Sequence, residues 1–115
     1  MKTIGLLGGM SWESSVEYYR IINETVKRRL GGLHSAKCLM YSVDFAEIES
    51  LQHAGEWNML TNTMVEASIR LESGGADCLV ICTNTMHQMA NEIQAAINIP
   101  LIHIADATAA KIQTK

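Results

Sequence analysis

The sequence has 115 residues, of which 48% are hydrophobic and 18% are charged, and its formal net charge is −3. These values are typical of one folded domain with a modest core, and they leave no room for a second domain. Lysine and arginine are scattered along the chain, which excludes a charged surface for nucleic acid or an anionic membrane and favours a small-molecule partner.

The N-terminal apolar run, Ile4 to Leu7, is too short for a signal peptide or a membrane span, so we expect a cytoplasmic protein. Three cysteines, Cys38, Cys78 and Cys82, lie in apolar segments, and an odd number without a secretory context argues against a disulfide framework. Cys78 and Cys82 would lie roughly 13 Å apart along a strand at about 3.3 Å per residue, so we expect no metal site.

Apolar runs alternate with helical patterns along the chain. Thr3 to Leu7 predicts a first buried strand that ends at Gly8-Gly9. Ser11 is expected to cap a helix that runs to about Leu30 and stops at Gly31-Gly32. Its predicted apolar face consists of Val16, Tyr19, Ile22, Val26 and Leu30.

The middle of the chain predicts a second strand and a second long helix. Lys37 to Val43 is the strand, followed by a short acidic turn or helix from Asp44 to Leu51 and a polar loop from Gln52 to Glu56. A helix from about Trp57 to Glu72 follows and ends at Gly74-Gly75. Its apolar face is Leu60, Met64, Ala67 and Leu71.

The last third begins with an unbroken apolar run, Cys78 to Cys82, which predicts a buried central strand. After Thr85 a helix is expected to reach about Ile97, Pro100 to Ile104 is a fourth short strand, and a further helix begins at Ala105. This order predicts a doubly wound α/β fold, a four-stranded parallel sheet with helices on both faces. Because the final helix has no stop signal, the chain is interpreted as the first part of a longer protein.

Polar or glycine-rich residues follow two of the predicted strands. Gly8 to Ser11 and Thr83 to Thr85 should lie at the same sheet edge, where strand ends and helix N-termini hold ligands. The cleft between them suits a compact anion, although Thr83 to Thr85 are also typical of simple helix caps. The glycines, Gly5, Gly8 and Gly9, lack the spacing of nucleotide-binding motifs, and a tight turn is the alternative explanation for them.

Three motifs together resemble the aspartate/glutamate racemase family. They are Ile4-Gly5-Leu6-Leu7-Gly8-Gly9-Met10-Ser11, Gly75-Ala76-Asp77 and Asn84-Thr85-Met86-His87. The resemblance covers the whole chain in order. It implies a two-lobed amino-acid racemase that needs no cofactor, with residues 1–115 as its N-terminal α/β lobe and the second lobe absent from this chain.

The resemblance also implies a position for the acid/base group of this lobe. Racemisation needs two such groups on opposite faces of the α-carbon, and the family's usual pattern is Cys-Asn-Thr. Here Thr83 stands immediately before Asn84-Thr85, and Cys82 stands one place earlier. Since adjacent strand residues point to opposite faces, Cys82 should point into the packing, and Thr83 is the predicted acid/base residue with Cys82 as the alternative. The second group is expected to be a cysteine of the missing lobe.

Substrate contacts follow from the same resemblance. Met10 with the Gly8-Gly9 turn, together with Thr83, Asn84 and Thr85, would hold the α-carboxylate and neighbouring atoms. Gln52 is expected to contact the side-chain carboxylate, and His87 has a supporting role. Asp44 to Gln52 contains no basic residue, which leaves the identity of the substrate side chain open.

Two other functions fit the sequence. One is a related racemase or isomerase with a different substrate, and the other is a binding module for a small anion such as a dicarboxylate or amino acid, without catalysis. Thr83 in place of cysteine keeps the binding module open. Helices that lie against a second lobe would expose apolar surface, so a homodimer is also possible.

Overall fold

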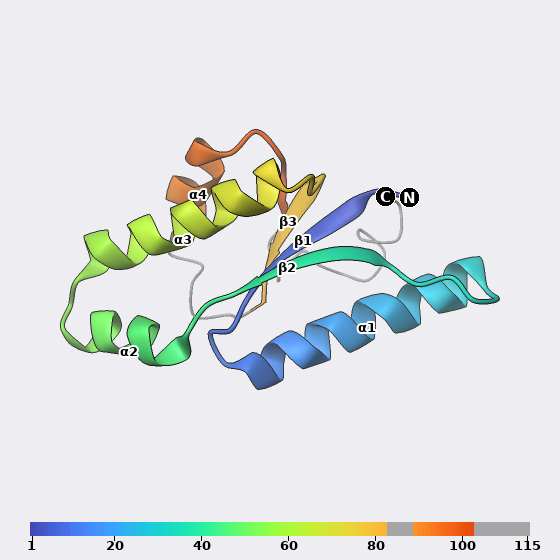
Figure 1. Ribbon diagram of the computed structural model, residues 1–115, viewed down its shortest axis with the longest axis horizontal. Helices are drawn as coiled ribbons and strands as arrows, with labels where there is room; N and C mark the ends of the chain where they lie inside the picture. Colours follow the sequence, from blue (N-terminus) through green and yellow to red (C-terminus); the bar gives the residue numbers. More distant parts are fainter. Residues whose placement is uncertain (83–88, 103–115) are drawn as a thin grey trace.

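The computed structural model describes residues 1–82 and 89–102, which form one parallel sheet with helices on both faces (Figure 1). The strands stand in the order β2-β1-β3-β4. Their bounds are Thr3–Gly8 for β1, Lys37–Ser42 for β2, Cys78–Ile81 for β3 and Leu101–Ile102 for β4. The helices are α1 Trp12–Leu30, α2 Phe45–His53, α3 Trp57–Ser73 and α4 Ala90–Ala96. The predicted doubly wound α/β fold is confirmed.

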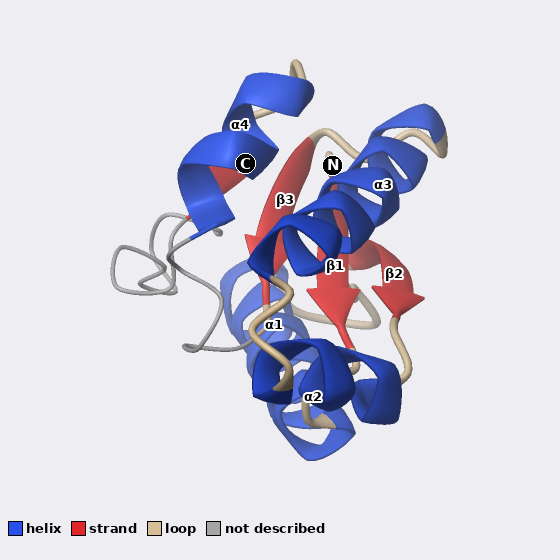
Figure 2. Cartoon of the chain, turned by 90° about the vertical axis from the view of Figure 1, so that its left-hand side faces the viewer, coloured by secondary structure: helices blue, strands red, loops and turns tan. Residues whose placement is uncertain are grey.

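The sheet separates two buried clusters, because successive side chains of β1 and β3 point to opposite faces. Leu7, Leu79 and Ile81 belong to the cluster covered by α2, α3 and α4. The cluster on the α1 side contains Leu6, Ile22, Cys78, Val80 and Cys82. Figures 1 and 2 show α1 on one side of the sheet and α3 with α4 on the other.

Helix α3 packs as its sequence pattern predicts. Its four predicted apolar positions, Leu60, Met64, Ala67 and Leu71, are all buried, and they line the cluster between the helix and the sheet. The hydroxyl of Ser68, also buried on this helix, donates to the carbonyl oxygen of Met64 at 2.8 Å. A buried polar group in this cluster is therefore satisfied within its own helix.

The predicted apolar face of α1 is partly wrong. Val16, Tyr19 and Leu30 are 55%, 49% and 55% exposed. The residues that α1 buries are Ser15, Ile22, Thr25 and Val26. Ile22 and Val26 are buried as predicted, whereas in the first turn Ser15, and not Val16, lies against the end of β1.

Two other predictions, the end of α2 and the cap of α1, also differ from the structure. Helix α2 continues to His53, so Gln52 is helical and not in a polar loop, since the left-handed residue that ends the segment, Gly55 with φ +71°, comes only three residues later. Ser11 precedes α1 but its side chain does not cap the helix; its hydroxyl donates to Glu13, and its backbone oxygen accepts the N–H of Ser14 and Ser15. Its φ of 98° differs from the extended conformation that a capping residue normally adopts.

Some predictions lie outside the described residues. These are Thr83 to Thr85, His87, the end of the fourth strand at His103 and Ile104, and the final helix from Ala105. Neither described range contains a helix that is both long and apolar enough to cross a lipid bilayer.

Candidate active site

Three strand ends are joined at one edge of the sheet. The amide of Val43, just after β2, donates to the carbonyl oxygen of Gly8 at 2.9 Å, and the amide of Cys82, just after β3, donates to that of Leu7 at 2.9 Å. The turn from Gly8 to Ser11 therefore lies between the ends of β2 and β3. Thr83 follows Cys82 directly in the sequence but is outside the described residues, as are Asn84, Thr85 and His87.

The two glycines of this turn are required by their surroundings. A Cβ on Gly8 would lie 2.5 Å from the hydroxyl oxygen of Ser15. Gly9 has φ +93°, and a Cβ there would overlap the backbone oxygen of Val43 and lie 2.5 Å from its nitrogen. These contacts agree with the alternative explanation that Gly8 and Gly9 allow a tight turn, and the turn brings α1 and the loop after β2 close to β1.

The turn presents backbone donors at the sheet edge. Gly9 and Ser11 both have positive φ, and only the Gly9 amide is hydrogen-bonded, to the oxygen of Ser15 at 3.0 Å. Among the described residues, the N–H groups of Met10, Ser11, Trp12 and Glu13 have no backbone or side-chain acceptor. Free amides at the start of a 19-residue helix, with its positive dipole end, favour an anionic group such as a carboxylate.

The side chain of Met10 is buried and not exposed at this edge. It is 3% exposed and belongs to the cluster that also holds Leu60 and Ile48. Met10 as a whole is thus covered, and the unpaired amides on exposed or half-buried residues of this turn are those of Ser11, Trp12 and Glu13. Gln52 lies one helical turn after Ile48 on α2 and is half-buried, and its side chain has no hydrogen-bond partner within the described part of the chain.

Cys82 is fully buried on the α1 side of the sheet, as expected from the alternation of strand residues. Burial, with a smaller contribution from Cys38, raises the pKa of its thiol to about 12. Burial and the proximity of Cys82 also raise the pKa of the Tyr18 hydroxyl on α1. At neutral pH the Cys82 thiol is protonated and out of reach of solvent, which disfavours it as an acid/base group.

Sequence reasoning missed Ser15, which is 3% exposed and joins α1 to the glycine turn. Its hydroxyl oxygen accepts the Gly9 amide, and its own amide donates to the Ser11 oxygen at 3.4 Å. The available signal was a small polar residue one turn into a helix that follows a Gly-Gly pair. In an amphipathic pattern such a residue is normally assigned to the solvent face.

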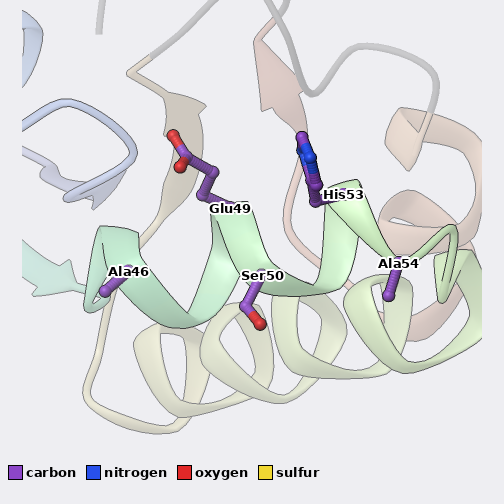
Figure 3. Close-up of a pocket in the computed structure, with 5 residues that line it drawn as sticks. All are labelled: Ala46, Glu49, Ser50, His53 and Ala54. Atoms are coloured by element: carbon purple, nitrogen blue, oxygen red, sulfur yellow. The ribbon is translucent and has the colours of Figure 1, made fainter.

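A shallow depression lies elsewhere, along α2, and is lined by Ala46, Glu49, Ser50, His53 and Ala54. Figure 3 shows Glu49 and His53 on one side of the helix and Ser50 on the other. Since all five residues come from one helix and its C-cap, the described chain supplies no opposing wall. Residues 1–82 and 89–102 also contain no group of three or more histidine, cysteine or acidic side chains that could hold a metal ion.

The chain matches the family model for Asp/Glu/hydantoin racemases over residues 7–115. A candidate Asp/Glu racemase from Yersinia pestis has 56% sequence identity and a TM-score of 0.90, with 99% of this chain and 50% of that chain covered. An aspartate racemase homologue from Pyrococcus horikoshii has 29% identity, a TM-score of 0.85 and the same coverage.

The broad-specificity amino-acid racemase RacX of Bacillus subtilis (strain 168) is 24% identical over an alignment of 114 residues that covers 95% of this chain and 48% of that protein. The chain thus spans about half the length of these relatives. The motifs at the ends of β1 and β3 and the fold agree with the family match, and the chain belongs to the Asp/Glu/hydantoin racemase family.

Proposed function

We propose that this chain is the N-terminal lobe of an amino-acid racemase that works without a cofactor, with aspartate or glutamate as its substrate. One observation carries the proposal. The ends of β1, β2 and β3 are hydrogen-bonded together at one sheet edge, and the amides of Ser11, Trp12 and Glu13, which have no acceptor among the described residues, lie beside that edge. Those amides would bind the substrate's α-carboxylate, with Asn84 and Thr85 completing the contacts.

The reaction removes the α-proton from one face of the substrate and returns a proton to the other. Thr83 is proposed as the group on the face of this lobe, and a cysteine of the second lobe as the group on the other. The buried, protonated state of Cys82 supports this choice between the two neighbouring residues. Because a neutral hydroxyl is a poor base, the cysteine thiolate would remove the α-proton and Thr83 would return a proton through its hydroxyl or an ordered water, so kcat would differ between the two enantiomers.

The substrate assignment rests on the relatives. The proteins from Yersinia pestis and Pyrococcus horikoshii carry the names of Asp/Glu and aspartate racemases, whereas the Bacillus subtilis relative has broad specificity. The turn segment 8–13 contains no lysine or arginine. Selection of an acidic side chain would therefore depend on Gln52 and on residues of the second lobe.

The test is deuterium incorporation at the α-carbon, followed by proton NMR in deuterated buffer. The full-length protein, dialysed against a chelator and supplied with no cofactor, is incubated with each enantiomer of aspartate and glutamate. The expected result is loss of the α-proton signal with formation of the opposite enantiomer, faster from one enantiomer than from the other at saturating substrate. Binding of a dicarboxylate without any α-proton exchange would contradict the racemase proposal and favour an anion-binding module.

A further inference from the structure

We propose that Ser15 is a positioning residue that holds the carboxylate-binding turn in its working conformation. This inference rests on the proposed function, because it assigns to Ser15 the placement of the amides that would bind substrate. Ser15 is 3% exposed and is one of three polar side chains that are buried in the described part of the chain. The other two, Thr25 and Ser68, lie further along helices α1 and α3, away from the glycine turn.

The contacts of Ser15 hold both ends of the dipeptide Met10-Ser11. Its hydroxyl oxygen accepts the amide of Gly9, at 3.0 Å, and its backbone amide donates to the carbonyl oxygen of Ser11, at 3.4 Å. Gly9, just before this dipeptide, is thus hydrogen-bonded to the Ser15 side chain, and Ser11, at its end, is hydrogen-bonded to the Ser15 backbone. The dipeptide and the first turn of α1 carry the unpaired amides.

The conformation that Ser15 holds is one the chain does not adopt readily. Ser11 has φ 98°, a region that residues with a Cβ seldom occupy, and such residues persist only where neighbouring contacts fix them. Gly9, with φ +93°, is bonded to Ser15 itself. Without the hydroxyl, the Gly9 amide would be left unpaired in a buried position, and the turn would be expected to shift to pair it.

Only a small side chain fits at this position. A Cβ on Gly8 would lie 2.5 Å from the Ser15 oxygen and 3.1 Å from the Ser15 Cβ, so the glycine and the serine are in close contact. Serine supplies both the small volume and the acceptor. Cysteine nearly matches the volume but is a weak acceptor, and alanine has no acceptor at all.

The experiment compares Ser15→Ala and Ser15→Cys with the wild type in the full-length protein. Ser14→Ala is the matched control, because Ser14 is the adjacent serine of the same helical turn and its side chain makes no hydrogen bond to a described residue. Displaced amides weaken binding of the carboxylate equally in the ground state and the transition state. Both Ser15 variants are therefore expected to raise KM roughly tenfold with kcat within about threefold of wild type, and the control to change neither.

Hydrogen exchange at the Gly9 amide supplies a readout besides activity. Exchange should quicken roughly tenfold or more in both Ser15 variants, while the β3 amides of Leu79 and Val80 keep their protection. A lower kcat with unchanged KM in both variants, as expected when part of the protein is simply unfolded, would overturn the proposal. Unchanged Gly9 exchange would overturn it as well.

The two proposals fail separately. If the wild-type protein racemises none of the substrates, the proposed function is wrong. The same variants are then compared by their Kd for L-aspartate, measured by calorimetry, in place of KM. A roughly tenfold weaker Kd in the Ser15 variants with faster Gly9 exchange would still support the role of Ser15 in placing the turn. Equal Kd values for wild type and both variants would contradict it.

Discussion

Helices α1 and α3 are similar in length, with 19 and 17 residues, but they bury different kinds of side chain. Helix α3 buries an apolar stripe with one self-satisfied serine, and it forms the core on its side of the sheet. Helix α1 buries two hydroxyl residues and two aliphatic ones, and its first turn is hydrogen-bonded to the turn that follows β1. The difference indicates that α3 mainly stabilises the fold, whereas the start of α1 mainly shapes the strand-end turn.

The exposed side of α1 extends this contrast. Trp12, Val16 and Tyr19 stand at i, i+4 and i+7, on one side of the helix, and all three are exposed in the described chain. The apolar periodicity of α1 is therefore real, but only its later part, at Ile22 and Val26, faces the sheet. Four comparisons of variants test this contrast between the core and the strand-end turn.

The largest effect is expected in α3. Leu60→Ala removes most of a fully buried side chain and should lower the free energy of unfolding by roughly 2 to 5 kcal/mol. Val16→Ala on α1 should change it by no more than about 0.5 kcal/mol. Urea denaturation of both variants measures the difference. A Val16→Ala cost close to that of Leu60→Ala would mean that the α1 stripe is covered in the protein.

The next effect is expected at the glycine turn. Gly9→Ala combines a positive φ with overlap between the new Cβ and the Val43 backbone, so it should cost about 3 kcal/mol. Gly31→Ala is the matched control, since Gly31 also has positive φ but open space around it, and it should cost about 1 kcal/mol. Thermal unfolding compares the two variants. Equal costs would show that the turn is not tightly packed.

The Cys82 thiol predicts a dependence of stability on alkaline pH. Its pKa is about 12 in the folded chain, against the ordinary 9.0, so the unfolded chain releases this proton first as pH rises. Its contribution is full below pH 9 and is lost between pH 9 and 12, by about 1 kcal/mol per pH unit. Wild type should lose stability more steeply than Cys82→Ala from pH 9 to 11 in urea titrations. Parallel curves would contradict the burial of this thiol.

The smallest effect concerns the start of α1. Ser11→Gly relieves the positive φ and should leave stability unchanged or raise it by up to about 1 kcal/mol, because glycine adopts φ 98° freely. Ser14→Gly, inside the helix, should lower stability by about 0.5 to 1 kcal/mol. In chemical denaturation, no loss for Ser11→Gly beside a loss for Ser14→Gly supports strain at Ser11, whereas equal losses would exclude it.

The sequence predicted the sheet and α3 because their signals are local. The apolar runs of β1 and β3 and the stripe of Leu60, Met64, Ala67 and Leu71 each follow from neighbouring residues alone. The face of α1 did not follow, because it depends on contact between Ser15 and Gly8, which are on different elements. Gln52 was placed in a loop because its polar neighbours resemble one, while the helix stop is Gly55.

Of the site, the sequence indicated the glycine turn after β1, and the structure shows this turn between the ends of β2 and β3. The buried position of the Met10 side chain could not be read from its place beside two glycines. The assignments of Thr83, Asn84, Thr85 and His87 stay predictions, because these residues lie outside the described part of the chain.

The most direct test of the account separates the two neighbouring residues at the end of β3. Rates of α-deuterium incorporation into aspartate and glutamate are measured for full-length wild type, Thr83→Ala and Cys82→Ala, after confirming that each is folded. Thr83→Ala is expected to slow conversion by at least about a hundredfold, whereas folded Cys82→Ala is expected to stay within a few-fold of wild type. Inactive Cys82→Ala beside unaffected Thr83→Ala would contradict this expectation and make the buried thiol the acid/base group.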